Sequence, residues 1–203
     1  MPKPTHREAI INAGLQTMFR KGYVGASVRD IVAAAGAPQG SFTNHFSSKE
    51  AFAGEVLDAY FAHVRALVRE AFEDESLTPG QRLVRYLDII TERLGHDGYT
   101  RGCLIGDLSI EAPGHSEALR QQLLAIYAEW TALFAAGIRD AQRSGELATD
   151  YPADELADFL LVAWEGAILR SKVERGRAPL DRFRRIAFNT VFKINPASSE
   201  EEA

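Results

Sequence analysis

A cluster of hydrogen-bonding side chains follows Pro38, and its chemistry is the most specific that the sequence offers. Its members each carry a compact donor or acceptor: Gln39, Ser41, Thr43, Asn44 and His45. Side chains of these types read base edges or hold phosphate oxygens in protein–DNA complexes. Phe42 and Phe46 lie four residues apart among them, so a helix would bury both rings on one face. The pattern predicts a helix whose other face binds nucleic acid.

Further groups for phosphate binding flank this cluster. Ser27 is the predicted cap of a short helix over residues 28–35, and Arg29 lies in the first turn of that helix. Lys49 lies at the start of the next long helix. Basic side chains and amide groups at helix starts are common contacts to backbone phosphates. We therefore expect Ser27, Arg29 and Lys49 to hold the DNA backbone.

Three helices would position these groups. The first is predicted to begin with Thr5 as its N-cap and to end at Gly22. Gly36 ends the second, because glycine adopts backbone conformations that are unfavourable for other residues. Pro38 then occupies the first position of the third helix. Two short helices joined by a glycine-containing turn form a helix-turn-helix unit.

Helical periodicity continues through the remainder of the chain, where apolar residues recur at steps of three and four. Six further helices are predicted, over residues 48–73, 80–94, 104–112, 116–144, 154–175 and 180–194. The expected fold is all-α, with about nine helices. A three-helix helix-turn-helix domain (1–50) would precede a larger helical domain (51–194) and a disordered acidic tail (195–203).

The distribution of charge favours a polyanionic partner at one end of the chain. The formal net charge is −5, yet residues 1–50 carry six Lys and Arg residues against three Asp and Glu residues. The remainder carries 17 Lys and Arg residues against 25 Asp and Glu residues. A basic head on an acidic body is suited to binding polyphosphate through the head alone.

The composition also indicates where in the cell the protein is expected. No apolar run is long enough to span a membrane, and the start MPKPTHREAI lacks the apolar core of a secretory signal. A single cysteine excludes an internal disulfide. We therefore expect a cytoplasmic protein with no membrane partner.

Residues 5–55 agree with a known pattern in their spacing, turn residues and polar positions together. The matching segments are 5–10, 19–22, 27–31, 35–36, 40–42, 44–46 and 48–50. On these residues the chain resembles the TetR/AcrR family of bacterial transcriptional regulators. Gln39 stands where Lys is frequent in that family, and Thr43 where Tyr is frequent. Both departures reduce phosphate contact, so affinity and operator sequence should differ from those common in the family.

The resemblance implies a homodimeric transcriptional repressor. Each subunit would place its third helix in one of two successive major grooves of a palindromic operator, about 34–36 Å apart. The larger domain would bind a small-molecule inducer and form the dimer through its last two helices. Residues with the spacing for that interface are Leu156, Phe159, Leu160, Ala163, Phe183, Ile186, Ala187 and Val191. Periodicity alone would equally place them in the core of one subunit, and we expect some of both.

A second resemblance concerns the possible sensor. Residues 101–111, residues 163–167 and Lys172 resemble the subgroup that contains the N-ethylmaleimide-responsive repressor, in which some members use a cysteine at this position to sense electrophiles or oxidants. Cys103 follows a Gly-rich loop at a predicted helix start, where the helix dipole favours the thiolate. Arg101 and Lys172 could add to this effect. The alternatives are a buried structural cysteine and a Lys172 side chain that reaches solvent.

A noncovalent pocket is the competing interpretation of the larger domain. Aromatic residues at helical spacing could line a cavity between helices, or they could form the core: Tyr86, Tyr127, Trp130, Phe134 and Trp164. We expect no cofactor. A metal site is disfavoured because one cysteine and scattered histidines lack a metal-ligand spacing.

Two other classes of function are disfavoured. An enzyme would need a nucleophile–base pair, a phosphate-binding glycine loop or paired carboxylates in a pocket, and we find none of these patterns. A helical adaptor without DNA binding is opposed by the intact helix-turn-helix pattern. The expected function is therefore repression that an inducer relieves.

Overall fold

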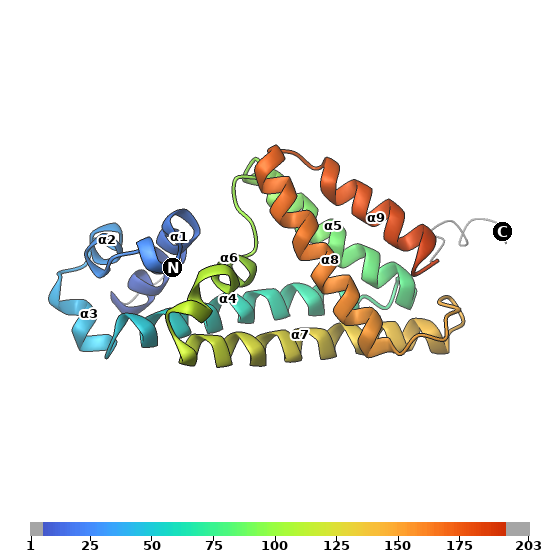
Figure 1. Cartoon of the computed structure of the whole chain (residues 1–203), viewed down its shortest axis with the longest axis horizontal. Coiled ribbons are helices and arrows are strands. Elements are labelled where there is room, and N and C mark those ends of the chain that lie inside the picture. The colour runs from blue at the N-terminus through green and yellow to red at the C-terminus, as the bar shows by residue number, and fades with distance from the viewer. Residues whose placement is uncertain (1–5, 194–203) are drawn as a thin grey trace. The chain divides into compact units, whose positions relative to one another are not determined.

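The computed structural model describes residues 6–193, and that part of the chain consists of helices and connecting turns (Figure 1). Its α-helices are α1 (His6–Gly25), α2 (Val28–Ala34), α3 (Gly40–His45), α4 (Lys49–Phe72), α5 (Pro79–His96), α6 (Leu104–Glu111), α7 (Glu117–Arg143), α8 (Ala153–Glu174) and α9 (Ala178–Thr190). A 3-10 turn, η1 (Ala112–Gly114), follows α6. The all-α fold with nine helices is thereby confirmed over the described residues. The predicted cap Thr5 and the predicted tail 195–203 lie outside them.

The chain divides into two compact units, each built from two segments. The first unit comprises Met1–Val64 and Cys103–Ile126, and the second comprises Arg65–Gly102 and Tyr127–Ala203. Helices α4 and α7 therefore each contribute residues to both units. The functional division at residue 50 stays a prediction, because these boundaries describe compactness alone.

The helix-turn-helix segment forms largely as its local sequence predicts. Ser27 caps α2 by accepting a hydrogen bond at Oγ from the amide of Asp30 (3.1 Å). Gly36 has a φ of 60°, the left-handed conformation that ends a helix favourably at glycine. Helix α3 begins at Gly40 rather than at Pro38. The Ser41 amide donates to the Pro38 carbonyl (2.9 Å), so Pro38 opens a tight turn ahead of the helix.

Helix α1 departs from its expected end. It continues to Gly25, but Gly22 breaks the helical path with φ 70° and ψ −178°. Only glycine reaches this backbone conformation readily. The amide of Ala26 then bonds to the Gly22 carbonyl (3.3 Å), which closes a separate turn between Gly22 and the start of α2.

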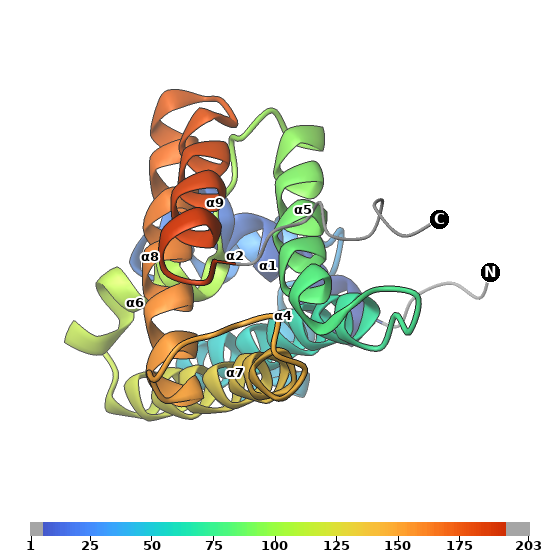
Figure 2. The ribbon, with the colours of Figure 1, turned by 90° about the vertical axis from the view of Figure 1, so that its right-hand side faces the viewer.

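The second unit has an aromatic and aliphatic core of its own. Helices α8 and α9 lie side by side in both ribbon views (Figure 2), and α9 also packs against α5. The Phe134 ring lies 4.9 Å from the Tyr86 ring and 5.3 Å from the Phe72 ring, measured between centroids. Thr78 and Gln81 form a capping box that fixes the start of α5. Among the described residues, no helix is both long and apolar enough to cross a membrane.

Candidate nucleic-acid interface

Helix α3 is anchored by two phenylalanines. Phe42 and Phe46 are each 3% exposed, and their ring centroids lie 5.2 Å apart. Both pack against Phe52 of α4, which is fully buried, with ring centroids 5.1 Å and 4.8 Å away. A short helix gains little stability from its own hydrogen bonds, so these aromatic contacts fix its orientation.

The polar residues of the same segment lie on the opposite side from this anchor. Gln39, Thr43, Asn44 and His45 are exposed, and Ser41 is half-buried. The Thr43 hydroxyl donates to the Gly40 carbonyl (3.1 Å), which keeps that short side chain against its own helix. The structure therefore separates a buried aromatic face from a hydrogen-bonding face, as a helix that enters a DNA groove requires.

Two predicted phosphate contacts lie at the start of α2. Ser27 and Arg29 are both exposed. Asp30 beside them accepts a hydrogen bond from Lys21 (2.8 Å), which links α2 to α1. The hydrogen bonds from Lys21 and then Ser27 lower the pKa of Asp30. Lys21 is thus already paired with Asp30, whereas Arg29 is exposed in the first turn of α2.

Lys49 has a more complex environment than the sequence indicated. Its Nζ donates to the Val24 carbonyl (3.1 Å) and lies 4.9 Å from the centre of the Tyr23 ring. Burial lowers the pKa of Lys49, and the negative charge of Glu111 partly opposes that shift. Burial, followed by the charge of Glu50, raises the pKa of Tyr23. The ammonium therefore holds residues 23 and 24 at the junction between α1 and α2, in addition to any contact with phosphate.

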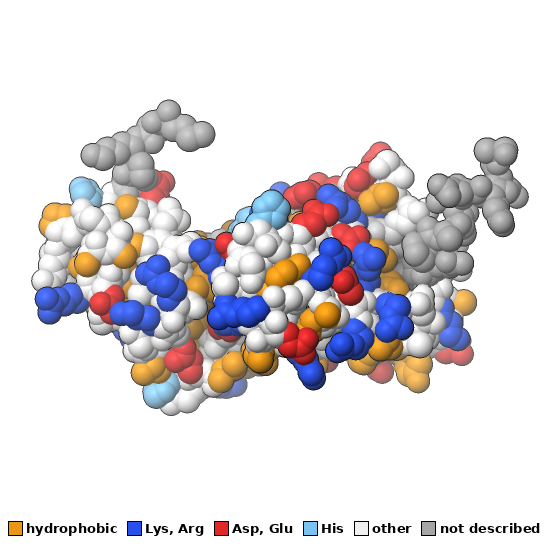
Figure 3. Space-filling model, turned by 90° about the horizontal axis from the view of Figure 1, so that it is seen from above, with side chains coloured by type: hydrophobic (Ala, Val, Ile, Leu, Met, Phe, Trp, Pro, Cys, Tyr) orange, Lys and Arg blue, Asp and Glu red, His pale blue; other side chains and the backbone are white. Residues whose placement is uncertain are grey.

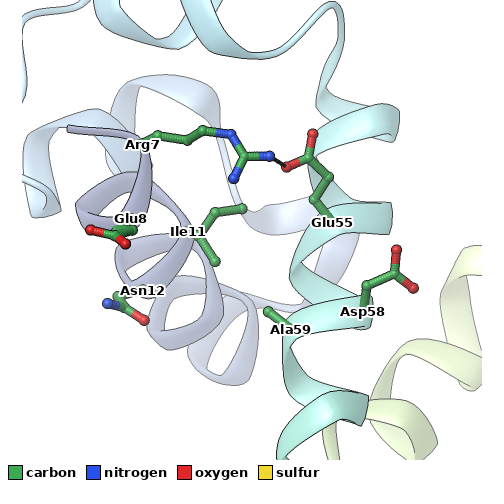
Figure 4. Close-up of a pocket in the computed structure, with 7 residues that line it drawn as sticks. All are labelled: Arg7, Glu8, Ile11, Asn12, Glu55, Asp58 and Ala59. Atoms are coloured by element: carbon green, nitrogen blue, oxygen red, sulfur yellow. Dashed lines mark hydrogen bonds and ion pairs between the residues drawn. The ribbon is translucent and has the colours of Figure 1, made fainter. Parts of the chain in front are cut away.

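The start of α1 is held by an arginine whose part the sequence did not reveal. Arg7 forms an ion pair with Glu55 of α4 (Figure 4) and lies 5.7 Å from the centre of the Phe46 ring. A groove of about 450 Å³ lies beside this pair, between α1 and α4. Its lining residues are Arg7, Glu8, Ile11, Asn12, Glu55, Asp58 and Ala59. Arg7 thereby connects α1 with α4 and with the end of α3.

Within the first unit, polar contacts also join α6 to the end of α1, and Ser116 and the start of α7 to α4. Glu111 of α6 accepts hydrogen bonds from the amides of Tyr23 (2.5 Å) and Val24 (3.2 Å). The Ser116 hydroxyl donates to Glu50. The Gln122 amide donates to the Gly54 carbonyl (2.9 Å) and to Asp58 (2.7 Å). Among these residues the sequence pattern singles out the neighbouring Gly22 alone, as a helix stop, and it gives no sign of the contacts themselves.

Cys103 lies in the N-cap position of α6, where its predicted place at a helix start is confirmed. It is 7% exposed. The other predicted effector residues, Tyr127, Trp130, Trp164 and Lys172, belong to the second unit, whereas Cys103 belongs to the first. Arg101, expected to support Cys103, has its guanidinium 3.7 Å from the Asp97 carboxylate.

The aromatic residues of the second unit lie mainly in its core. Trp130 and Trp164 are 2% and 1% exposed, and Tyr127 and Lys172 are half-buried. The rings of Tyr127 and Trp130 are nearly parallel, with centroids 6.4 Å apart. Trp164 packs against Phe183 (5.4 Å), and its indole Nε1 is buried without an acceptor in the described part of the chain.

The residues expected at the dimer interface divide between core and surface. Leu156, Leu160 and Ala187 are buried, whereas Phe159 and Ile186 are 45% and 49% exposed. Figure 3 shows one face of the molecule, on which apolar side chains reach the surface among charged ones. A groove of about 340 Å³ runs between α8 and α9 and is predominantly apolar. Its lining residues are Phe159, Ala163, Gly166, Ala167, Arg170, Pro179, Arg182, Phe183, Ile186, Ala187, Thr190 and Val191.

Two family models match the chain. Residues 10–56 match the model described as bacterial regulatory proteins, tetR family. Residues 79–187 match the model described as tetracyclin repressor-like, C-terminal domain. The first match covers the helix-turn-helix segment, and the second covers more than half of the chain.

Known proteins show the same relationship along almost the whole chain. The transcriptional repressor DhaR of Mycobacterium sp. (strain GP1) is 41% identical over 201 residues, which is 99% of this chain and 100% of DhaR. The crystal structure of reduced E. coli NemR has a TM-score of 0.84 at 25% identity, covering 91% of this chain and 95% of NemR. A CifR cysteine mutant, solved with a 26-bp operator duplex, has a TM-score of 0.77 at 26% identity, covering 91% and 98%.

These matches agree with the geometry of the first unit, where a polar-faced α3 follows a capped α2 and a glycine turn. They extend through the helices that follow, so the relationship is not confined to one motif. The chain therefore belongs to the TetR family, and it is a transcriptional repressor of that family with a helix-turn-helix DNA-binding domain.

Proposed function

We propose that the chain acts as a cytoplasmic homodimer, binds a palindromic operator through two copies of α3, and is released by a small-molecule inducer. The observation that carries the DNA-binding part is the division of α3 into a buried side at Phe42 and an exposed polar side. Gln39 and Asn44 are assigned to base edges. Ser41, Thr43 and His45 support either base or phosphate contact, and Ser27, Arg29 and Lys49 hold phosphates.

The apolar groove between α8 and α9 supports the dimer. Phe159 and Ile186 expose large apolar surfaces there, which a second copy of the same groove would cover. A twofold axis through this surface would pack α8 and α9 of one subunit against α8 and α9 of the other. Two copies of α3, the reading helix of each subunit, are required because a single six-residue helix makes too few contacts for a specific site.

Replacement of Arg29 by alanine tests the phosphate contacts. We expect Arg29→Ala to weaken binding to all DNA sequences and to reduce the slope of log affinity against log salt by about 1 for each phosphate that is no longer bound. Fluorescence anisotropy over a salt series, with a duplex enriched from a random library by the full chain, measures both effects. Asn44→Ala is the matched comparison, because removal of a base contact changes site preference and leaves the salt slope unchanged. An unchanged slope for Arg29→Ala would remove this residue from the interface.

We propose Cys103 as the point at which an electrophilic inducer acts. The thiol is 7% exposed at the start of α6, so an added group cannot be accommodated without displacement of the first turn of that helix. Addition of the Cys103 thiol to a maleimide needs no further reactant. The sulfur forms a thioether with one alkene carbon, and the thiol proton ends on the other. DNA release would then be a shift toward a conformation in which the two reading helices no longer fit their grooves.

N-ethylmaleimide tests this proposal directly, because Cys103 is the single cysteine of the chain. Treatment of the DNA-bound protein is expected to lower operator affinity at least tenfold in the wild type and to leave Cys103→Ser unaffected. Mass spectrometry gives the extent of alkylation in the same samples. Full alkylation without DNA release would show that Cys103 is a structural residue.

The second candidate is a noncovalent inducer, and Trp164 favours it. The indole N–H of Trp164 is buried without an acceptor in the described chain, and a ligand with a hydrogen-bond acceptor would satisfy it. A thermal-shift panel of lipophilic ketones and carboxylic acids should contain compounds that stabilise the wild type and act less on Trp164→Phe. Equal stabilisation of both proteins would exclude Trp164 as a ligand contact.

A further inference from the structure

At the junction between α1 and α2, two backbone amides donate to a side chain of another helix. Gly22 interrupts the helical path, and the turn that follows begins with the amides of Tyr23 and Val24. Both donate to the carboxylate of Glu111, at 2.5 Å and 3.2 Å. The start of a helical turn carries partial positive charge, so a carboxylate is the favoured acceptor there. Glu111 thus caps this turn from a helix 88 residues away in sequence.

The fit between Glu111 and the junction is close. A Cβ atom on Gly22 would lie 2.1 Å from Oε1 of Glu111, so no larger residue fits while the carboxylate keeps this position. On the other side, Lys49 of α4 donates to the Val24 carbonyl and lies over the Tyr23 ring. The junction is therefore held through its amides by α6 and through a carbonyl and a ring by α4.

The consequence concerns α2, which begins directly after this junction. Ser27 and Arg29, the phosphate contacts of the proposed interface, lie three to five residues beyond Val24. Movement of the junction would move both, together with the turn that leads to α3. Cys103 occupies the opposite end of the same short helix from Glu111.

We propose that Glu111 is a positioning residue for DNA recognition: it holds the α1–α2 junction in the orientation that the operator requires and connects α6 to the reading helices. It does not contact DNA. The proposal rests on the DNA-binding function above and extends it. It makes α6 the element through which a change at Cys103 would reach the helix-turn-helix segment.

The direction in which Glu111→Gln changes DNA affinity distinguishes a positioning role from a purely electrostatic effect. Removal of a carboxylate near a DNA-binding surface reduces repulsion, so charge alone predicts tighter binding of Glu111→Gln to any duplex. Loss of positioning predicts weaker binding to the specific duplex. The glutamine amide also places a donor where one of the two backbone amides needs an acceptor.

The experiment compares Glu111→Gln with the wild type on two duplexes, one enriched from a random library by the full chain and one of scrambled sequence. We expect affinity for the enriched duplex to fall about tenfold, within the usual range for coupled sites. Affinity for the scrambled duplex should be unchanged or higher, with an unchanged salt slope. A merely structural defect would weaken binding to both duplexes. Equal affinity of wild type and variant for the enriched duplex would overturn the proposal.

Glu117→Gln is the matched control. It also removes one carboxylate from the first unit, but Glu117 is exposed and bonds to Arg120 and Gln121 of its own helix. Its affinity for the enriched duplex should not fall. If the wild type shows no preference for the enriched duplex, the proposed function itself fails, which is a different outcome from failure of the positioning role.

Hydrogen exchange followed by NMR gives a test without DNA. In the wild type, the amides of Tyr23 and Val24 should be protected, and in Glu111→Gln the amide that faces the glutamine NH2 group should exchange at least tenfold faster. The Asp30 amide, capped by Ser27, should be unaffected. Fast exchange of Tyr23 and Val24 in the wild type would overturn the proposal even if the variant did not fold. Gly22→Ala, which displaces the carboxylate from the other side, should reproduce the loss of specific binding.

Discussion

A lysine in place of Ile186 is expected to separate the proposed dimer and to lower operator affinity by about 10²- to 10⁴-fold. Ile186 lies in the apolar groove between α8 and α9 and is 49% exposed in the single chain. A lysine there is solvated in the monomer, whereas in a dimer its charge would be buried without a partner. Each half-site would then be bound separately, without the high effective concentration that linkage of two reading helices provides.

Analytical ultracentrifugation and anisotropy on the enriched duplex measure the two effects together. The thermal midpoint of the monomeric unit should change little, since substitutions at exposed positions usually alter stability by less than about 0.5 kcal/mol. Tyr151→Lys is the matched control, because Tyr151 is 65% exposed and lies outside the groove. A dimer of Ile186→Lys with normal operator affinity would mean that the subunits associate through another surface.

Phe42→Ala is expected to destabilise the helix-turn-helix segment by about 3–5 kcal/mol. Phe42 is 3% exposed and contacts the rings of Phe46 and Phe52, so its removal leaves a cavity and takes one ring contact from each of them. Natural domains have only about 5–15 kcal/mol of stability in total. The destabilisation should therefore be a large fraction of the total stability, raise the population in which α3 is unfolded and weaken operator binding with it.

Denaturant unfolding monitored by circular dichroism, together with hydrogen exchange in α3, follows this change. Asn44→Ala on the same helix is the control. Asn44 is exposed and alanine has the higher helix propensity, so its free energy of unfolding should stay the same or rise slightly. Asn44→Ala should nevertheless alter DNA preference. An unfolding free energy for Phe42→Ala within about 1 kcal/mol of the wild type would contradict the anchoring role.

The parts of the fold that depend on short-range interactions could be predicted from the sequence. The Ser27 cap, the left-handed Gly36 and the pair of buried rings in α3 each depend on residues fewer than ten positions apart. The predicted start of α3 at Pro38 is wrong by two residues, because proline suits the first position of a tight turn as well as that of a helix.

Long-range polar contacts could not be predicted in this way. The bonds from Tyr23 and Val24 to Glu111 join residues almost ninety positions apart, and an exposed glutamate on a helix would have the same sequence pattern. Periodicity also could not distinguish core from surface on α8. Leu156 and Phe159 both fit an apolar face, yet Leu156 is buried and Phe159 is exposed. A helix packed on more than one side carries apolar residues for each partner.

The composition of the first unit has a consequence for recombination between relatives. Residues 6–64 pack with Cys103–Ile126, so the amino-terminal recognition module is completed by a segment encoded much further along the gene. A chimera joined near residue 50 would confront the donor's Tyr23 and Glu50 with the recipient's Glu111 and Ser116. Exchange of operator specificity between paralogues should therefore succeed most readily when both segments are transferred together.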